Sequence, residues 1–269
     1  MKDIKYLRDN GVDVNQSLEL LGDLDTYNEM IKDFKASLKD KKAQIEKYYN
    51  DKDMPNYAVY VHSLKSDCKY FGFLKLAEIA YEHELKSKEN NYEFVKANFD
   101  QLMDETRKVQ GIVDNYLGNA EETADTYGGS ASEPVEALGP AKPDDIILVA
   151  DDSEVIRIFV KKIFDVEYEL AFAADGEEAL KVIQEHQLDN RIKAILLDLN
   201  MPRKNGFAVL DYMKENNLLG KMPVTVISGD QSSDAINKAF DYNIVDMLSK
   251  PFNEQKIKEA VEKTINSAK

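Results

Sequence analysis

The chain has 269 residues and a formal net charge of −15, and 43% of its residues are hydrophobic. This length favours two domains, and the composition is typical of a globular protein in water. Because neither half of the chain is basic, the charge argues against nucleic-acid binding through phosphate contacts. No apolar run reaches the ~20 residues of a membrane-spanning helix, and the N-terminus lacks the apolar stretch of a signal peptide. Cys68 is the single cysteine, so no internal disulfide can form, and these features predict a cytoplasmic protein without membrane contact.

Residues 1–117 carry apolar side chains at helical spacing throughout. One stripe consists of Tyr27, Met30, Ile31, Phe34 and Leu38, and a second of Tyr57, Val61, Leu64, Cys68 and Phe71. Two further helical patterns cover residues 74–85 and 94–117. Pro55 lies near an expected helix start, where proline is tolerated. Helices joined by short connections predict an all-α antiparallel helical bundle.

The stretch 118–143 is dominated by small, acidic and helix-breaking residues and has no periodic apolar face. Such a composition is typical of a flexible linker. We therefore predict a helical domain over residues 1–117 and a second domain over residues 144–269.

Residues 144–269 alternate short apolar runs with helical patterns. The expected strands are 146–150, 168–173, 192–197, 224–227 and a fifth that ends at Lys250. The expected helices are 155–164, 177–183, 207–213, 235–240 and 257–265. Runs that are apolar on both faces suit strands buried in a parallel sheet. The alternation predicts an α/β doubly wound, five-stranded parallel sheet of flavodoxin-like architecture, and ligands of such folds bind beyond the carboxyl ends of the strands.

Residues with recognised chemistry follow the strands at that edge. They are Asp151 and Asp152 after the first strand, Asp198 after the third, Ser228 after the fourth and Lys250 after the fifth. Three converging carboxylates repel one another, and a divalent cation would neutralise them. Mg²⁺ suits oxygen ligands and a phosphate partner. A carboxylate can accept a phosphoryl group as a nucleophile, while a cation, a lysine and a hydroxyl hold the phosphoryl oxygens.

Four short segments of the sequence contain these residues. They are Val149-Ala150-Asp151-Asp152-Ser153, Leu197-Asp198-Leu199-Asn200-Met201-Pro202, Val226-Ile227-Ser228-Gly229 and Ser249-Lys250-Pro251-Phe252. Through them, residues 145–268 resemble the receiver domain of two-component response regulators. The resemblance implies that Asp198 is the phosphoacceptor and that Ser228 and Lys250 contact the phosphoryl group. It also implies a cis peptide before Pro251 and a Mg²⁺ site formed by Asp151, Asp152, Asp198 and the backbone carbonyl of Asn200.

The chain departs from the receiver pattern at two positions. Met247 stands where the family often has the aromatic residue of a rotating switch, which puts an output through that switch in doubt. Asn243 stands where the family usually has glycine, and asparagine tolerates the left-handed backbone expected there. A receiver that mainly passes phosphoryl groups on would need the aromatic switch less.

A histidine lies beside the second apolar stripe of the N-terminal half. Helical spacing places Lys65 and Lys69 on the same face as His62. Because Val61 and Leu64 face the core, His62 is expected to lie next to them and to reach solvent. A neutral imidazole is a competent nucleophile near physiological pH, and the ammonium groups would steady an incoming phosphoryl group. The alternative is a surface histidine without a role.

The stretch His62-Ser63-Leu64-Lys65-Ser66, with Gly72 ten residues after the histidine, resembles the histidine phosphotransfer domain, or Hpt domain. The resemblance covers about residues 10–117 and implies that His62 is a second phosphoacceptor. Members of that family often have glycine where Ser66 stands, and serine is of similar size.

The remaining histidines and the cysteine are expected to be structural. His83 is expected on a solvated helix face, and His186 near a helix end, where a cation suits the helix dipole. Neither has metal-ligand spacing to another histidine or cysteine. Cys68 fits the apolar stripe and is expected in the core.

Together the two resemblances predict a phosphorelay protein of bacterial two-component signalling that carries phosphoryl groups on His62 and Asp198. Transfer would run between them or with partner proteins, such as a sensor histidine kinase, a hybrid kinase, another receiver or another Hpt protein. The chain shows no glycine-rich phosphate loop, so it is expected to be a phosphotransfer protein without its own kinase domain. Two alternatives remain open: a phosphate sink, and a phosphorylation-gated interaction module without relay through His62.

Overall fold

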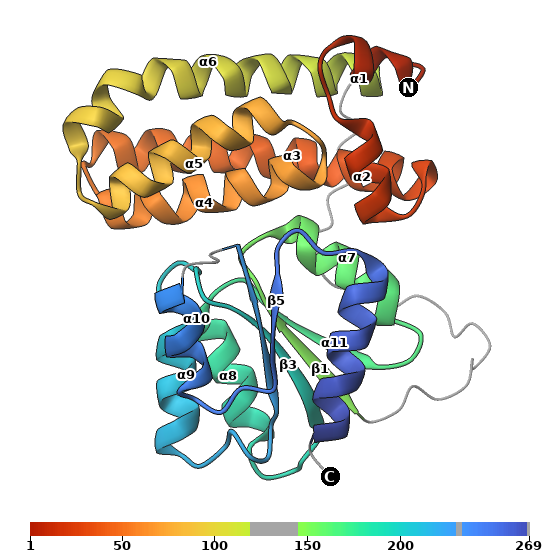
Figure 1. Cartoon of the computed structure of the whole chain (residues 1–269), viewed down its shortest axis with the longest axis vertical. Helices are drawn as coiled ribbons and strands as arrows, with labels where there is room; N and C mark the ends of the chain where they lie inside the picture. The colour runs from red at the N-terminus through yellow and green to blue at the C-terminus, as the bar shows by residue number, and fades with distance from the viewer. Residues whose placement is uncertain (119–144, 230–232, 268–269) are drawn as a thin grey trace, which may run out of the picture.

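The computed structural model describes residues 1–118, 145–229 and 233–267. Figure 1 shows a helical N-terminal part in contact with a C-terminal part that is built on a sheet. The linker predicted for residues 118–143 lies outside the described residues, except for Gly118, which follows the last helix of the N-terminal part.

The N-terminal part is the predicted antiparallel bundle. Its helices are α1 (Lys5–Asp9), α2 (Val14–Leu21), α3 (Leu24–Asn50), α4 (Met54–Tyr70), α5 (Leu74–Lys88) and α6 (Tyr92–Leu117). The long helices α3 to α6 lie side by side, and α1 and α2 cover one end of them (Figure 1). Side-chain oxygens of Asp23, Asp53 and Asn91 accept hydrogen bonds from the first turns of α3, α4 and α6. Each cap satisfies a backbone N–H that has no partner inside its helix.

The turn between α4 and α5 depends on a glycine. Gly72 has a φ of +76°, and a Cβ added there would lie 2.4 Å from the carbonyl oxygen of Asp13. A side chain at this position would be strained and would also clash with backbone. Beside the turn, the rings of Phe71 and Phe34 stack in the core with their centroids 4.6 Å apart.

The C-terminal part is the predicted doubly wound domain. Its strands are β1 (Ile146–Ala150), β2 (Glu169–Ala173), β3 (Ile192–Asp198), β4 (Val224–Ser228) and β5 (Asp246–Ser249). They pair in parallel in the order β2-β1-β3-β4-β5. Its helices are α7 (Glu154–Phe164), α8 (Gly176–His186), α9 (Gly206–Glu215), α10 (Ser233–Phe240) and α11 (Glu254–Ser267).

The sheet has an apolar core on each face. Helices α7 and α11 cover one face, and α8, α9 and α10 cover the other (Figure 1). Alternate residues of β1 belong to the two cores, since Ile147 and Val149 pack under α7 and α11 whereas Ile146 and Leu148 pack under α8 and α9. The core under α7 and α11 continues into the helical bundle, so one apolar cluster joins the two parts of the chain.

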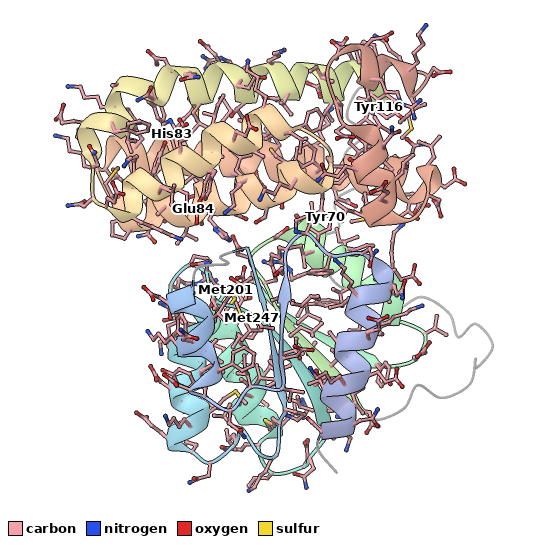
Figure 2. All side chains as sticks on the ribbon, in the orientation of Figure 1. Tyr70, His83, Glu84, Tyr116, Met201 and Met247 are labelled. Atoms are coloured by element: carbon pink, nitrogen blue, oxygen red, sulfur yellow. The ribbon has the colours of Figure 1, made fainter. Side chains whose placement is uncertain are left out.

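Two smaller expectations for this part concern its backbone. The peptide bond between Lys250 and Pro251 is cis, and Asn243 has a φ of +58°. Both expectations are thereby confirmed. Met247 lies in β5 and packs, half-buried, against the core under α8 and α9, to which Met201 also belongs (Figure 2).

The expected solvent exposure of His83 was wrong. The side chain is completely buried between α4 and α6, and its Nδ1 lies 2.7 Å from the hydroxyl of Tyr57. The ring also packs edge-on against Phe94. Polar neighbours in the sequence, Glu82 and Glu84, suggested an exposed face, but the bundle encloses α5 on more than one side. Cys68 is buried in the core as expected.

Burial of His83 predicts a pH dependence of stability. Burial lowers the pKa of this histidine from 6.5 to about 4, so the unfolded chain binds the proton more readily than the folded chain. The contribution is fully present above pH 6.5 and is lost as the pH falls towards 4, to a limit of about 3 kcal/mol. Denaturant unfolding of the bundle across this range measures it. His83→Asn is expected to flatten the profile and His186→Asn to preserve it, and equal profiles for His83→Asn and the wild type would contradict this assignment.

Candidate functional site

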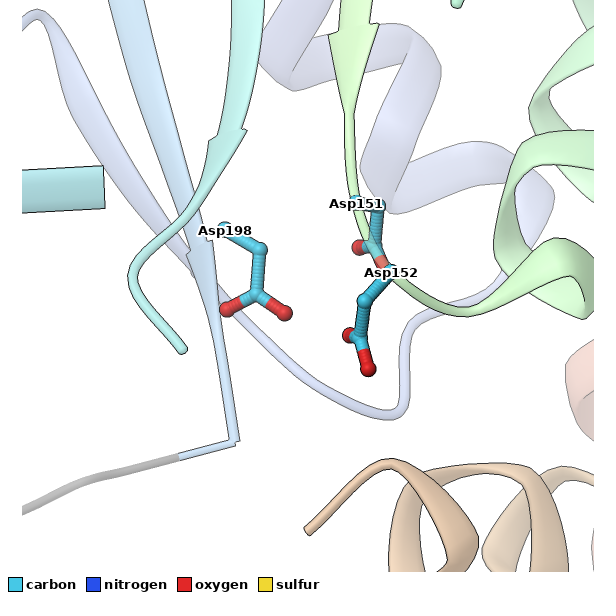
Figure 3. Close-up of side chains that lie close together, drawn as sticks. All are labelled: Asp151, Asp152 and Asp198. Carbon is cyan, nitrogen blue, oxygen red and sulfur yellow. The ribbon is translucent and has the colours of Figure 1, made fainter. Parts of the chain in front are cut away.

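Three carboxylates meet at the carboxyl edge of the sheet (Figure 3). Asp151 and Asp152 follow β1, and Asp198 is the last residue of β3. One oxygen from each lies within 4.8 Å of the others. Asp151 and Asp198 are completely buried, and Asp152 is partly exposed. The sequence therefore placed these carboxylates together correctly.

A buried lysine faces this cluster. The Nζ of Lys250 lies 2.6 Å from Oδ2 of Asp198 and 2.7 Å from Oδ2 of Asp151. Since Lys250 is itself buried, its charge acts on both carboxylates with little solvent screening. Ser228 is buried at the end of β4, at the same edge, and the backbone N–H of Asn200 donates to Oδ1 of Asp198 at 3.0 Å.

The carboxylates differ in their affinity for protons. Burial raises the pKa of Asp151 to about 7, and the neighbouring charges of Asp198 and Asp152 add to this against the opposing effect of Lys250. Burial acts in the same direction on Asp198, but the charges of Lys250 and His62 outweigh it and hold the pKa of Asp198 below its ordinary value. These charges therefore favour the ionised form of Asp198, which is the form that can act as a nucleophile.

The donor set fits a hard divalent cation. It consists of carboxylate oxygens from Asp151, Asp152 and Asp198, with Asn200 in the loop directly after β3. One buried lysine compensates only part of their combined charge, so the cluster retains negative charge that a cation would balance.

The second site lies on α4. The Nδ1 of His62 is 2.7 Å from Oε1 of Glu84, which projects from α5. Glu84 also accepts from Lys65 at 2.6 Å and from Lys88 at 2.7 Å. Burial alone would raise the pKa of Glu84, but the hydrogen bond and charge of His62 and the charges of the two lysines lower it.

These partners determine which ring nitrogen of His62 is available. The ammonium of Lys65 lies 3.3 Å from Nδ1, but the carboxylate of Glu84 is nearer, at 2.7 Å, and can only accept, so Nδ1 carries the proton that is donated to Glu84. In the neutral ring, Nε2 then holds the free lone pair. Nε2 is buried and has no hydrogen-bond partner among the residues that the structure describes. The ring therefore presents an unpaired nucleophilic nitrogen.

His62 was expected to reach solvent, and this expectation was wrong. Its side chain is 1% exposed because the C-terminal domain covers it. A Cβ added at Gly229, just after β4, would lie 3.3 Å from Cε1 and 3.5 Å from Nε2 of His62. Lys65 is buried as well, and burial lowers its pKa, with a smaller effect in the same direction from the charge of Lys69. Lys69 is half-buried on the same helix.

Sequence reasoning missed Glu84. Its segment, Glu82-His83-Glu84, was interpreted as a solvated face, although the side chain of Glu84 is only 3% exposed. A usable signal was present: Glu84 is followed by Lys88 four residues later, the spacing of an ion pair on one helix. The packing of α5 against α4 that brings Glu84 to His62 is a tertiary contact, and no local sequence pattern predicts it.

A hollow opens between the two parts of the chain, beside the carboxylates. Its walls include Lys41 and Tyr60 from the bundle and Asp152 and Arg203 from the C-terminal domain. Two cationic side chains therefore line an approach to the partly exposed Asp152.

No helix within the described ranges is long and apolar enough to cross a membrane.

Comparison with known proteins assigns the two parts of the chain to two domain families. The family model of the response regulator receiver domain matches residues 147–262, and that of the Hpt domain matches residues 29–110. The chain belongs to the response-regulator receiver family and carries an Hpt domain. It therefore combines the two domain types of a two-component phosphorelay.

The receiver domain has curated relatives in bacteria and plants. Over 110 residues the chain is 41% identical to Response regulator RR06 of Streptococcus pneumoniae, covering 40% of this chain and 46% of that protein. It is 30% identical over 111 residues to Two-component response regulator ORR3 of Oryza sativa subsp. indica, covering 41% of this chain and 82% of that protein. The chain thus spans less than half the length of RR06. Among solved structures, the receiver domain of the Francisella response regulator 1452 is 28% identical, with a TM-score of 0.41, covering 46% of this chain and 99% of that one.

Proposed function

We propose that this chain is a phosphorelay protein that carries phosphoryl groups on Asp198 of the receiver domain and on His62 of the Hpt domain. The observation that supports this most directly is the position of His62. Its unpaired Nε2 lies against Gly229, at the edge of the pocket that holds Asp198. The charge of His62 also lowers the pKa of Asp198, so the two groups are near enough to interact.

Within the receiver pocket, Asp198 acts as the nucleophile that forms the acyl phosphate. Lys250, already paired with Asp198, turns to the phosphoryl oxygens as they arrive, and the hydroxyl of Ser228 donates to one of them. Asp151, Asp152, Asp198 and the backbone carbonyl of Asn200 would hold Mg²⁺. When bound, Mg²⁺ supplies positive charge to the phosphoryl oxygens.

Within the Hpt domain, Glu84 holds the His62 ring so that Nε2 faces the receiver. Lys65 donates a hydrogen bond to Glu84. We propose that Lys65 and Lys69 provide positive charge beside the phosphorylated ring. The burial of His62 under the receiver speaks against a gated interaction module in which His62 has no role. A phosphate sink remains distinguishable, because it forms phosphoaspartate without forward transfer.

We propose the same limits for the functional units as the sequence predicts: an Hpt domain over residues 1–117, a linker over 118–143 and a receiver over 144–269. The phosphoryl donor is then a sensor histidine kinase or hybrid kinase, and further receivers or Hpt proteins serve as exchange partners. Nucleic acid is not among the proposed partners, because the net charge is −15.

The metal dependence of labelling tests the receiver half of this proposal. Wild-type protein incubated with acetyl phosphate and Mg²⁺ is expected to gain one phosphoryl group on Asp198, identified by peptide mass spectrometry. Chelation of the metal is expected to lower labelling by on the order of 10²-fold, because charge on the phosphoryl oxygens then goes uncompensated. Labelling that proceeds equally well in chelator would refute the metal site.

Glu84→Gln tests the positioning of His62. The hydrogen bond to an ionised carboxylate is lost, which predicts about 10- to 100-fold slower phosphoryl transfer to His62. Phosphorylation of Asp198 is expected to stay unchanged, and Glu84→Asp is expected to restore part of the rate. Nitrogen NMR of the His62 ring should show the proton leaving its fixed place on Nδ1. The matched control is Glu82→Gln on the exposed face of α5; an equal effect of both variants would exclude a specific role for Glu84.

A further inference from the structure

The receiver residues that lie against His62 belong to the same chain as the histidine. Within the described residues, contacts that join the Hpt domain to the receiver lie along α4 at the histidine and in the two turns after it. The backbone at Gly229 meets the ring of His62 and approaches the Nζ of Lys65. The receiver therefore recognises the surface around the phosphorylatable histidine, and not a remote part of the bundle.

A buried polar cluster forms part of this contact. Asp67, one turn after His62 on α4, is completely buried, and its Oδ1 accepts from the hydroxyl of Ser153 at 2.6 Å. Its Oδ2 accepts from Ser37 at 2.9 Å and from Lys41. Ser153 is also the N-cap of the receiver helix α7, where its oxygen accepts from the N–H of Ile156. Its single hydroxyl proton is thus free to bind the Hpt carboxylate.

An aromatic contact lies one turn further along α4. The hydroxyl of Tyr70, at the end of α4, accepts from the backbone N–H of Phe252 at 3.1 Å. Its ring meets the ring of Phe252 edge-on at 6.0 Å and that of Phe159 at 6.2 Å. All three rings are buried, and Figure 2 shows Tyr70 where the bundle meets the receiver. Phe252 lies two residues after Lys250, so this contact joins the bundle to the segment of the receiver that directly follows the strand end at Lys250.

These contacts have the composition of a specific interface. A buried carboxylate needs all its partners, and removing one of them leaves an expensive unpaired charge. Asp67 obtains one of its three partners from the receiver, so separation of the domains exposes or unpairs it. At the rim, Lys162 of α7 pairs with Glu29 of α3 in a solvent-exposed contact that adds charge complementarity.

We propose that the receiver docks the Hpt domain of its own chain, with Asp67 and Tyr70 as the residues that set the register, and that phosphoryl transfer between Asp198 and His62 occurs inside one chain. This inference rests on the proposed function of both residues. In the transfer step, the lone pair of Nε2 forms a bond to phosphorus while the bond from phosphorus to the Asp198 oxygen breaks. Asp198 leaves as a carboxylate with the bonding pair. The proton on Nδ1 stays on the ring and keeps its hydrogen bond to Glu84. The reverse step returns the group, so no further reactant is needed.

The dependence of transfer on protein concentration tests this inference. Wild-type protein is labelled on Asp198 with acetyl phosphate in Mg²⁺, the donor is removed, and phosphohistidine is followed over a wide range of protein concentration. A first-order rate constant that does not change on dilution is expected. A mixture of labelled His62→Gln with Asp198→Asn, which permits transfer only between chains, should be about 10²-fold slower or more at micromolar protein. A wild-type rate proportional to concentration would overturn transfer within the chain and would leave the relay itself intact.

Tyr70→Phe tests whether Tyr70 fixes the position in which the receiver docks on the Hpt domain. It removes one hydroxyl and keeps the ring, so transfer within the chain should slow by about 3- to 10-fold, while labelling of Asp198 by acetyl phosphate stays unchanged. The matched control is Tyr116→Phe, which removes a hydroxyl bonded to Asn28 inside the bundle, far from the receiver (Figure 2). Equal rates for Tyr70→Phe and the wild type would overturn the role of Tyr70. Absence of phosphohistidine at every concentration, with Asp198 labelled, would instead overturn the proposed function of His62.

Discussion

Asp198→Asn is expected to abolish phosphorylation of the receiver, with a fall of about 10³-fold or more in labelling by acetyl phosphate. The amide of asparagine is not a nucleophile, although it keeps the size of the carboxyl group and an oxygen that can accept from the N–H of Asn200. The variant is expected to fold, since Lys250 keeps Asp151 as an ionic partner. Peptide mass spectrometry and thermal unfolding measure the two effects separately.

The matched control is Asp189→Asn. This carboxylate is on the surface of the same domain, where it is paired with His186, and it lies outside the acidic pocket. Wild-type labelling is expected for it. Phosphoaspartate at a normal level in Asp198→Asn would show that another carboxylate accepts the phosphoryl group, and it would remove the receiver pocket from the account.

His62→Gln is expected to eliminate phosphohistidine, a loss of about 10³-fold or more, and to leave labelling of Asp198 intact. Glutamine has no nucleophilic nitrogen, because its amide lone pair is delocalised. Since the phosphoryl group then has no acceptor within the chain, phosphoaspartate is expected to persist longer than in the wild type. Chemical-stability assays distinguish the two species, because a phosphoramidate survives base and an acyl phosphate does not.

His186→Gln makes the same substitution at a receiver histidine on the protein surface, and it is expected to behave as the wild type. Phosphohistidine that persists in His62→Gln would mean that another histidine carries the group. His83 is enclosed in the bundle core and hydrogen-bonded to Tyr57, which makes it a poor candidate for that role.

The fold was largely predictable because its periodicities are local. The helical stripes through Tyr27 and Tyr57 and the apolar runs of the sheet are set by which face of each element is buried. The pocket was predictable for a related reason: parallel strands place their carboxyl ends at one edge, so Asp151 and Asp198 meet even though 46 residues separate them in the sequence.

What escaped prediction depends on contacts between elements. His62 was expected to reach solvent because α4 alone would expose it, whereas Glu84 of α5 and the receiver backbone at Gly229 lie against its ring. Glu84 and His83 were interpreted from their polar surroundings in the sequence, whereas the packing of α5 against its neighbours decides their burial. The pairing of Asp67 with Ser153 joins residues from the two domains, and helical spacing carries no information about such a pair.

The most direct test of the relay is a pulse and chase on the wild-type chain. Asp198 is labelled with radioactive acetyl phosphate in Mg²⁺, the donor is removed, and label on Asp198, on His62 and in free phosphate is measured over time. The account predicts that label on His62 rises as label on Asp198 falls, and that this rise is missing in His62→Gln. Release of all label as free phosphate, with none on His62 at any time, would contradict the account and would identify the chain as a phosphate sink.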